Sequence, residues 1–310
     1  MPTRYHSLVA DSSRWDGFEF RPDDIVICTP AKCGTTWMQM ICALLVFQTT
    51  TFEKPLDLIS PWLDMLTRER DDVVADLDAQ THRRFIKTHT PFDGLPYHPR
   101  VTYIAVGRDP RDVALSWENH RDNTDLEKLI VARANAVGLD DLAELYPDGI
   151  PERPDTQIER FWQWVDDPTD PTAAGGAASL EATVQHLATY WAVRDRENVL
   201  LFHYDDLKAD LAGQMRRLAS HLGISVPEEL WPELVDAATF ERMRAGADRI
   251  APDTTHEIWQ DNRQFFHRGE SGQWRELLDE DGLRRYNARV AELAAPDLVR
   301  WLHREAQLVP

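Results

Sequence analysis

The sequence contains little of what disulfide or metal scaffolds need. Among its 310 residues there are only three cysteines, Cys28, Cys33 and Cys42. They fall within one short segment and lack the paired spacing of zinc ligands, so we expect neither a metal site nor a disulfide framework. Unpaired cysteines are typical of proteins in a reducing compartment, and we therefore predict a cytoplasmic protein.

Positive charge and long apolar runs are also scarce. The 34 lysines and arginines are outnumbered by 53 acidic residues, which gives a net charge of −19. This balance argues against nucleic-acid or anionic-membrane partners, and an anionic ligand would need a local basic pocket. No apolar run approaches the roughly 20 residues of a membrane-spanning helix. The first residues are polar and lack the apolar core of a signal peptide, and the chain shows no internal repeat.

One stretch, residues 24–47, organises the rest of the chain. A short β-branched run ends at Pro30, small and polar residues follow, and apolar residues then recur at helical spacing from Trp37. This pattern predicts a strand, a tight loop and a helix. Such a loop directs backbone N–H groups and a helix N-terminus at an anion. Lys32 adds a positive charge and Gly34 allows close approach, so we predict a phosphate-binding loop.

Two familiar phosphate-binding loops fit this stretch poorly. In nucleoside-triphosphatases the lysine follows the last glycine and precedes a magnesium-binding Ser or Thr. Here Lys32 precedes Gly34, which counts against a small-molecule kinase without removing it as an alternative. A thiol phosphatase would use Cys33 but needs an arginine at the far end of the loop, and positions 37–40 offer none.

The apolar runs define the fold class. Four short runs begin near Ile25, Phe85, Val101 and Val199 and are separated by helical segments. This order predicts an α/β fold, a single domain with a mainly parallel central sheet flanked by helices. Just beyond the carboxyl ends of the runs stand Lys32, His89, Arg108 and Tyr204. Ligands of open α/β sheets bind at that edge, so these four side chains are expected to meet there.

The loop PAKCGTTW at residues 30–37 resembles the P-K-S-G-T-T-W loop of cytosolic-type sulfotransferases. These enzymes use 3′-phosphoadenosine-5′-phosphosulfate (PAPS) and release 3′-phosphoadenosine-5′-phosphate (PAP). Further segments are similar to family motifs in the same order: KTHTP at 87–91, RDPRDVALS at 108–116, YDDLK at 204–208, ATFERM at 238–243 and FFHRGESGQWR at 265–275. The resemblance spans roughly residues 24–275, which would form the core of one domain over 1–310.

The resemblance implies a cofactor site in three parts. The loop residues Lys32, Cys33, Gly34, Thr35, Thr36 and Trp37 would hold the 5′-phosphosulfate. The 3′-phosphate would lie against Arg108, Ser116, His267, Arg268 and Gly269. The adenine would lie by Tyr204, Thr239, Phe240 and Met243, with Trp37 and Phe240 on its two faces. No metal is expected in the reaction.

The resemblance also implies catalytic roles for four side chains. His89 would be the general base that takes the proton of an acceptor hydroxyl. Lys32 would stabilise the leaving phosphate oxygen and Lys87 the sulfuryl oxygens. Ser116 would contact the 3′-phosphate and hold Lys32 back until an acceptor arrives.

Several positions depart from the family pattern. Ala238 replaces a threonine that bonds the base, Asp109 replaces an asparagine, Gln273 replaces an aspartate, and His267 carries charge only when protonated. The family's dimer motif is not matched at residues 275–284, so we predict no oligomeric state.

The acceptor segments align worst. Phenols, steroids, sugars, glycolipids and other small alcohols or amines stay open as acceptors, and Trp162 and Trp164 are equally consistent with an acceptor pocket and with packing. We predict a flexible insertion at about 165–180, helical spacing at 61–77 and a helical tail at 276–310. Besides the kinase, a non-catalytic phosphoadenosine sensor with Cys33 as a redox switch remains an alternative.

Overall fold

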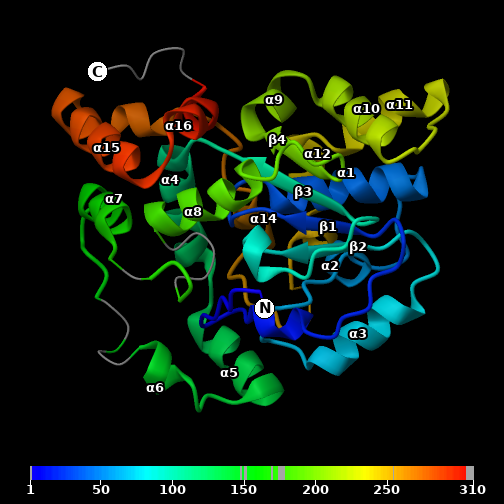
Figure 1. Cartoon of the computed structure of the whole chain (residues 1–310), viewed down its shortest axis with the longest axis horizontal. Coiled ribbons are helices and arrows are strands. Elements are labelled where there is room, and N and C mark those ends of the chain that lie inside the picture. The colour runs from blue at the N-terminus through cyan, green and yellow to red at the C-terminus, as the bar shows by residue number, and fades with distance from the viewer. Residues whose placement is uncertain are drawn as a thin grey trace.

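The computed structural model describes residues 2–146, 149, 152–168, 170–173, 179–253 and 255–304. Its four strands are β1 (Ile25–Cys28), β2 (Phe85–Thr88), β3 (Thr102–Gly107) and β4 (Val199–His203). They form one parallel sheet in the order β2-β1-β3-β4 (Figure 1). All four strands lie where the apolar runs predict them, and the α/β fold with a parallel sheet is confirmed.

Helices make up most of the remaining described chain. The first half contains α1 (Thr35–Phe47), α2 (Leu56–Ile59), α3 (Arg70–Ala79), α4 (Pro110–Asn123), α5 (Leu126–Val137) and α6 (Leu142–Leu145). The middle contains α7 (Gln157–Asp166), α8 (Leu180–Trp191), α9 (Tyr204–Ala209), α10 (Leu211–His221) and α11 (Trp231–Ala237). The last part contains α12 (Phe240–Ala245), α13 (Ala247–Ile250), α14 (Asn262–Phe265), α15 (Glu280–Leu293) and α16 (Pro296–His303).

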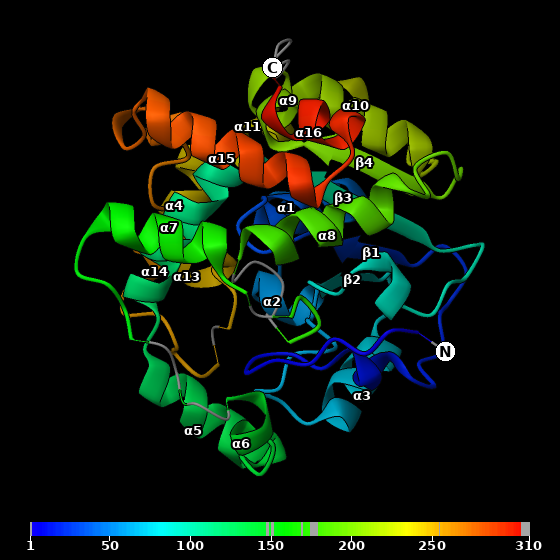
Figure 2. The ribbon, with the colours of Figure 1, turned by 60° about the vertical axis from the view of Figure 1, so that its left-hand side comes forward.

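Helices cover both faces of the sheet. Alternate residues of β1 point to opposite sides, as in any strand. Ile25 and Ile27 pack into a cluster with α1 and α10, whereas Val26 and Cys28 pack into a second cluster with Tyr190 of α8. Figure 2 shows α8 crossing one face of the sheet. Because both faces are buried, the strands are largely apolar, and their carboxyl ends remain the accessible edge.

The C-terminal helices α15 and α16 dock on this core, and residues 305–310 of the predicted helical tail lie outside the described residues. A β-carbon added to Gly107, at the end of β3, would lie 2.3 Å from the Trp301 ring of α16. The Tyr286 hydroxyl of α15 lies 2.9 Å from Nε2 of His303. No helix in the described part of the chain has both the length and the apolar character needed to cross a membrane.

The helical prediction for residues 61–77 is wrong in its first half. Only α3, from Arg70, is helical there. Asp64 is fully buried, and its Oδ2 accepts hydrogen bonds from the Trp15 indole and from the hydroxyls of Thr88 and Thr90, at 3.0, 2.6 and 2.6 Å. Three partners from distant segments fix the carboxylate and outweigh local helical spacing.

Two further predictions concern residues 157–180. Trp164 is buried in a cluster with Leu180 and Tyr286, and Trp162 packs against the same cluster, so both are packing residues. The predicted flexible insertion at 165–180 lies partly outside the described residues, because 169 and 174–178 are not described.

Candidate active site

A cavity of about 670 Å³ opens at the carboxyl edge of the sheet. Its walls include the loop after β1, the ends of β2 and β3, the start of α9 and the segment from Thr239 to Gln273. Sixteen of the seventeen residues expected from the sequence line it: Lys32, Gly34, Thr35, Thr36, Trp37, Lys87, His89, Arg108, Ser116, Tyr204, Thr239, Phe240, Met243, His267, Arg268 and Gly269. The structure therefore brings together segments up to 237 positions apart in the chain.

The loop after β1 presents unpaired backbone donors. The first helical hydrogen bond of α1 runs from Met38 N–H to the Gly34 carbonyl, at 2.9 Å. The N–H groups of residues 34–37 have no protein partner in the described structure. Gly34 has φ +101°, and a β-carbon there would lie 3.3 Å from the Tyr204 ring. Free N–H groups at the start of a 13-residue helix fit an anion such as a phosphosulfate.

Cys33 is the exception among the expected residues. Its side chain is fully buried in an apolar cluster with Ala31 and Val113, away from the cavity. Its N–H donates to the Pro30 carbonyl at 3.4 Å, within the turn. Burial raises the pKa of the Cys33 thiol to about 12, so the thiolate is disfavoured. This placement offers no support for a redox switch at Cys33.

Arg108 lies where a second anionic group would be bound. Its side chain is 7% exposed and donates to the carbonyls of Lys32 and Glu270, at 3.0 and 3.2 Å. Its guanidinium lies 4.4 Å from the Tyr204 ring centre, and its Nε has no hydrogen-bond partner. A buried donor without a partner is rare in native proteins, and a bound phosphate would satisfy it.

The segment after Phe266 closes over Arg108. The Gly272 N–H donates to both carboxylate oxygens of Asp112, at 2.8 and 3.0 Å. Gly269 has φ +67°, and a β-carbon there would lie 2.7 Å from the Phe240 ring. Glycine is therefore required for the approach of this backbone to Phe240. Arg268 is exposed at the cavity and can turn towards a ligand.

His267 adds little positive charge at neutral pH. Partial burial lowers its pKa, and the nearby positive charges of Arg268 and Arg244 lower it further. The neutral ring can still donate one hydrogen bond. Arg268, which donates to Oε1 of Gln273 at 3.4 Å, remains the charged member of the pair.

Aromatic and apolar side chains line the region next to Arg108. The Trp37 indole donates to the Ala238 carbonyl at 2.8 Å and meets Tyr204 edge to face at 5.3 Å. This bond uses the main chain, so replacing the family's threonine by Ala238 leaves it intact. The Thr239 hydroxyl caps α12 and donates to the Asp236 carbonyl at 2.7 Å.

His89 has the tautomer of a general base. Its Nδ1 lies 2.6 Å from the Thr29 carbonyl, which can only accept, so Nδ1 carries the hydrogen and Nε2 keeps its lone pair. The ring packs edge to face against Trp62 at 4.7 Å. Burial lowers its pKa well below the ordinary value, and Lys87 adds to this effect. The imidazole is therefore mainly neutral at neutral pH.

Two lysines share the cavity with His89. Burial lowers the pKa of Lys32 to about 7, with further lowering by Arg108 and Lys87. Burial also lowers the pKa of Lys87 to about 8, and its Nζ lies 4.1 Å from the Trp62 ring centre. A bound polyanion would favour the charged form of both.

Sequence reasoning missed His120. Its Nδ1 lies 3.2 Å from Lys32 Nζ, whereas no described hydrogen bond joins Lys32 to Ser116. His120 follows Ser116 by four residues on α4, which places it on the same helix face. That spacing was the available signal, but the motif used in the sequence analysis ends at Ser116.

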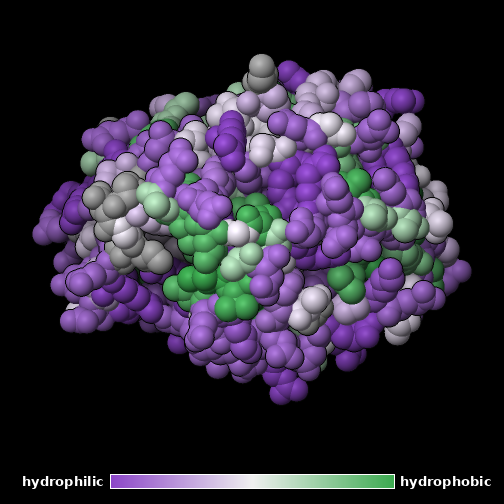
Figure 3. Space-filling model, turned by 90° about the horizontal axis from the view of Figure 1, so that it is seen from below, coloured by the Kyte–Doolittle hydropathy of each residue, from purple (hydrophilic) through white to green (hydrophobic). Residues whose placement is uncertain are grey.

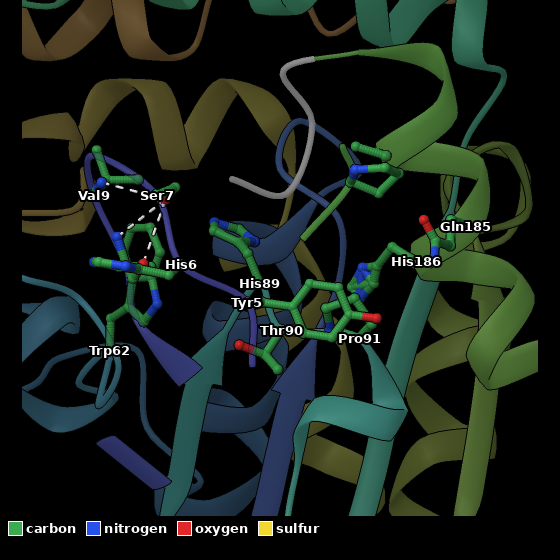
Figure 4. Close-up of a pocket in the computed structure, with 13 residues that line it drawn as sticks. Tyr5, His6, Ser7, Val9, Trp62, His89, Thr90, Pro91, Gln185 and His186 are labelled. Atoms are coloured by element: carbon green, nitrogen blue, oxygen red, sulfur yellow. Dashed lines mark hydrogen bonds between the residues drawn. The ribbon is translucent and has the colours of Figure 1, made fainter. Parts of the chain in front are cut away.

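A small hollow of about 30 Å³ adjoins His89 on its other side. Figure 4 shows Trp62, Ser7 and Val9 on one side of it and Gln185 and His186 of α8 on the other. His186 is fully buried, and neither of its ring nitrogens has a protein partner. Burial lowers its pKa to about 3. The volume suits one or two water molecules, which would satisfy these nitrogens.

The fold and the cavity define an α/β protein with a site suited to a ligand that carries two separated anionic groups. Comparison with known proteins gives the family: a sulfotransferase domain model matches residues 22–296. The chain belongs to this family and is a PAPS-dependent sulfotransferase. It is 42% identical to a glycolipid sulfotransferase of Mycobacterium bovis, over 96% of this chain and 93% of the relative.

More distant relatives are also named as sulfotransferases. Rat sulfotransferase 1A1 is 25% identical over 87% of this chain and 84% of its own length. Two solved structures share the fold. Mouse sulfotransferase SULT7A1 complexed with PAP has a TM-score of 0.67 and 18% identity, covering 94% of this chain and 91% of its own. Retinol dehydratase in complex with androsterone and PAP has a TM-score of 0.65 and 21% identity, covering 92% and 86%.

Proposed function

We propose that this sulfotransferase acts on a hydroxyl group of an amphiphilic, lipid-like acceptor, with His89 as the general base. The observation that carries the proposal is the tautomer of His89, because its Nδ1–H···O bond to Thr29 leaves Nε2 free in a cavity that also contains Lys32 and Lys87. A glycolipid is the first acceptor to test, since the relatives at 42% identity are named for that substrate.

The chain's residues divide between the two ends of PAPS. The N–H groups of residues 34–37 would hold the phosphosulfate. Arg108 would offer its unpartnered Nε to the 3′-phosphate, together with Arg268, Gly269 and Ser116. The rings of Trp37, Tyr204 and Phe240 and the side chain of Met243 would surround the adenine.

PAPS supplies the sulfuryl group: a bond forms between the acceptor oxygen and sulfur as the bond from sulfur to the 5′-phosphate oxygen breaks. Nε2 of His89 takes the hydroxyl proton, and the ammonium of Lys32 stabilises the negative charge on the departing phosphate. Lys87 offsets the charge of the sulfuryl oxygens. His89 is neutral at pH 7 because its pKa is low, so the base is in its active form before substrate binds.

Apolar walls favour an acceptor with a large apolar part. The cavity continues from His89 towards Met65, Trp117, Leu129, Ile258 and Trp259. Leu129 belongs to α5, whose outer side exposes Leu126, Val131 and Val137. Apolar side chains gather on the face seen in Figure 3, on the side of the molecule where α5 lies in Figure 1. Such a surface suits a lipid-like molecule better than a free sugar. A cytoplasmic location remains a prediction from the cysteines.

The test is transfer of radiolabelled sulfate from PAPS to a panel of one glycolipid, one steroid, one phenol and one free sugar. We expect the glycolipid to have the highest kcat/KM and His89→Ala to lower the transfer rate by roughly 10²- to 10⁴-fold. Preference for the free sugar would exclude the lipid-like acceptor. Transfer by His89→Ala at the wild-type rate would exclude His89 as the base.

A further inference from the structure

The buried carboxylate of Asp64 binds the residues on both sides of the proposed base. Asp64 lies in the segment between α2 and α3, and its Oδ2 accepts hydrogen bonds from the hydroxyls of Thr88 and Thr90, both at 2.6 Å. His89 stands between these two threonines in the chain. Asp64 does not line the cavity, so it can act on the reaction only through its partners.

The hydrogen atoms at this carboxylate can each be assigned to a donor. The Thr90 N–H donates to the Thr88 hydroxyl oxygen at 2.9 Å, so the hydrogen of that hydroxyl is left for Asp64. The Thr90 hydroxyl and the Trp15 indole each supply one further hydrogen. Burial raises the pKa of Asp64, and these three bonds oppose the rise because they favour the ionised carboxylate.

The two threonine side chains determine the direction in which His89 points. Both hydroxyls reach the same oxygen atom, so the two side chains lie on the same side of the chain. Side chains alternate along an extended backbone, and the residue between them therefore points to the opposite side. His89 lines the cavity, whereas Thr88 and Thr90 do not. A backbone that is held at both positions cannot turn about its own axis, which fixes where the imidazole begins.

The segment that carries Asp64 also packs against the base. Trp62, two residues before Asp64, meets the His89 ring edge to face at 4.7 Å. The Lys87 N–H donates to the Pro61 carbonyl at 2.9 Å, which joins this segment to β2. The bonds of Asp64 therefore hold together the strand end that presents the base and the segment that packs against it.

We propose that Asp64 is a positioning residue for His89, because its carboxylate fixes the threonines on both sides of the base. This inference rests on the proposed function, in which Nε2 of His89 takes the acceptor proton. Without these bonds the imidazole would sample directions in which Nε2 does not face the acceptor hydroxyl. Misplacement by about 1 Å can cost roughly 100-fold in rate, so kcat should fall while PAP and acceptor still bind.

The first test changes the contact from both sides. Thr90→Val removes the hydroxyl at nearly constant volume, whereas Thr90→Ser keeps it. Asp64→Asn keeps one side-chain oxygen for the same donors, whereas Asp64→Leu keeps none. Thr183→Val is the matched control, because Thr183 is also fully buried and its hydroxyl donates to the Ser179 carbonyl at 2.9 Å, but it does not line the cavity. The measured quantities are kcat, the KM of the acceptor and the Kd of PAP.

We expect Thr90→Val to lower kcat by roughly tenfold to 100-fold, with KM and Kd within about threefold of wild type. Thr90→Ser and Thr183→Val should keep kcat within about threefold, and Asp64→Asn should retain more of kcat than Asp64→Leu. Thr90→Val decides the test if Asp64→Leu does not fold. The inference is overturned if kcat of Thr90→Val stays within about threefold of wild type, or if Asp64→Asn retains no more of kcat than a folded Asp64→Leu. An equal loss of kcat in Thr183→Val, or an equal loss of PAP affinity in Thr90→Val, would also overturn it, because either would show a general effect on the structure.

A second measurement reports on the His89 ring and needs no activity. In the PAP complex of protein labelled with ¹⁵N-histidine, the nitrogen chemical shifts distinguish the two tautomers, and the His89 signals are assigned by their loss in His89→Gln. Wild type should carry the hydrogen on Nδ1, bonded to the Thr29 carbonyl, whereas Thr90→Val should show a mixture of tautomers. A mixture in wild type, or a single unchanged tautomer in Thr90→Val, refutes the inference.

The two measurements separate this inference from the proposed function. Suppose that the tautomer is fixed in wild type and mixed in Thr90→Val, while His89→Ala transfers sulfate at the wild-type rate. The proposed role of His89 as the base would then be wrong, and the positioning of its ring by Asp64 would stand.

Discussion

Replacing Arg108 by alanine should weaken PAP binding by about two orders of magnitude. Arg108 is nearly buried, holds the carbonyls of Lys32 and Glu270, and keeps Nε without a partner. Hydrogen bonds to charged groups contribute about 1.5–3 kcal/mol each. Loss of the charged contact between this guanidinium and phosphate, partly replaced by water, should therefore cost about 3 kcal/mol, or roughly 100-fold in Kd. Arg108→Lys keeps the charge but not the planar fork and should lose roughly tenfold.

Calorimetric titration with PAP and with adenosine 5′-phosphate measures how much the contact between Arg108 and the 3′-phosphate contributes to affinity. The second ligand lacks the 3′-phosphate, so its affinity should change little in either variant. Arg249→Ala is the matched control, because Arg249 also donates to two carbonyls, those of Phe52 and Glu53, but does not line the cavity. A Kd for PAP within threefold of wild type in Arg108→Ala, or equal losses for both ligands, would refute the assignment of Arg108 to the 3′-phosphate.

Three further predictions follow from the site. His89→Ala should lower kcat by roughly 10²- to 10⁴-fold while PAP binds within threefold of wild type; a matching loss of PAP affinity would point to a structural role instead. Because the pKa of Lys32 is about 7 in the free protein, Lys32 is mostly neutral at pH 8, and a bound polyanion should recharge it. Calorimetry at pH 8 in two buffers of different ionisation enthalpy should therefore show proton uptake on PAP binding, and this uptake should be smaller in Lys32→Met. The affinity for PAP should also fall as the pH rises from 7 to 9. If PAP binding takes up no proton, the lowered pKa of Lys32 is contradicted. Cys33→Ser should keep full transfer activity and lose about 1 kcal/mol of unfolding free energy, because a hydroxyl replaces a thiol in an apolar cluster. The redox-switch hypothesis would be supported if Cys33→Ser lost activity. It would also be supported if oxidants inhibited the wild-type protein but not this variant.

The sheet and most of the cavity were predictable because both depend on short local patterns. Ile25, Phe85 and Val199 begin strands at the expected residues, and β3 begins at Thr102, one residue after Val101. The carboxyl ends of parallel strands lie at the same edge of the sheet, so the residues that follow the strands lie close together there. This holds regardless of the structure of the connecting segments. That is why His89 and Arg108 could be placed together from the sequence alone.

What the sequence did not predict depends on single long-range contacts. Asp64 binds Trp15, Thr88 and Thr90, which no local spacing indicates, and this network overrides the helical pattern before Arg70. The Cys33 side chain packs in an apolar cluster with Val113 of α4, a contact that the pattern of the loop does not indicate. The replacement at Ala238 suggested a lost contact, although the contact that matters for Trp37 is made by the main-chain carbonyl.

The backbone of Lys32 has a consequence for how this protein could change. Lys32 adopts φ +64°, a left-handed conformation that glycine adopts freely and that costs other residues about 1–2 kcal/mol. Its amine is also held where burial opposes its charge. Both effects favour glycine at this position for the sake of thermal stability alone. Selection for heat resistance without selection for activity would therefore tend to remove Lys32, and a more robust protein obtained in that way would have lost its reaction.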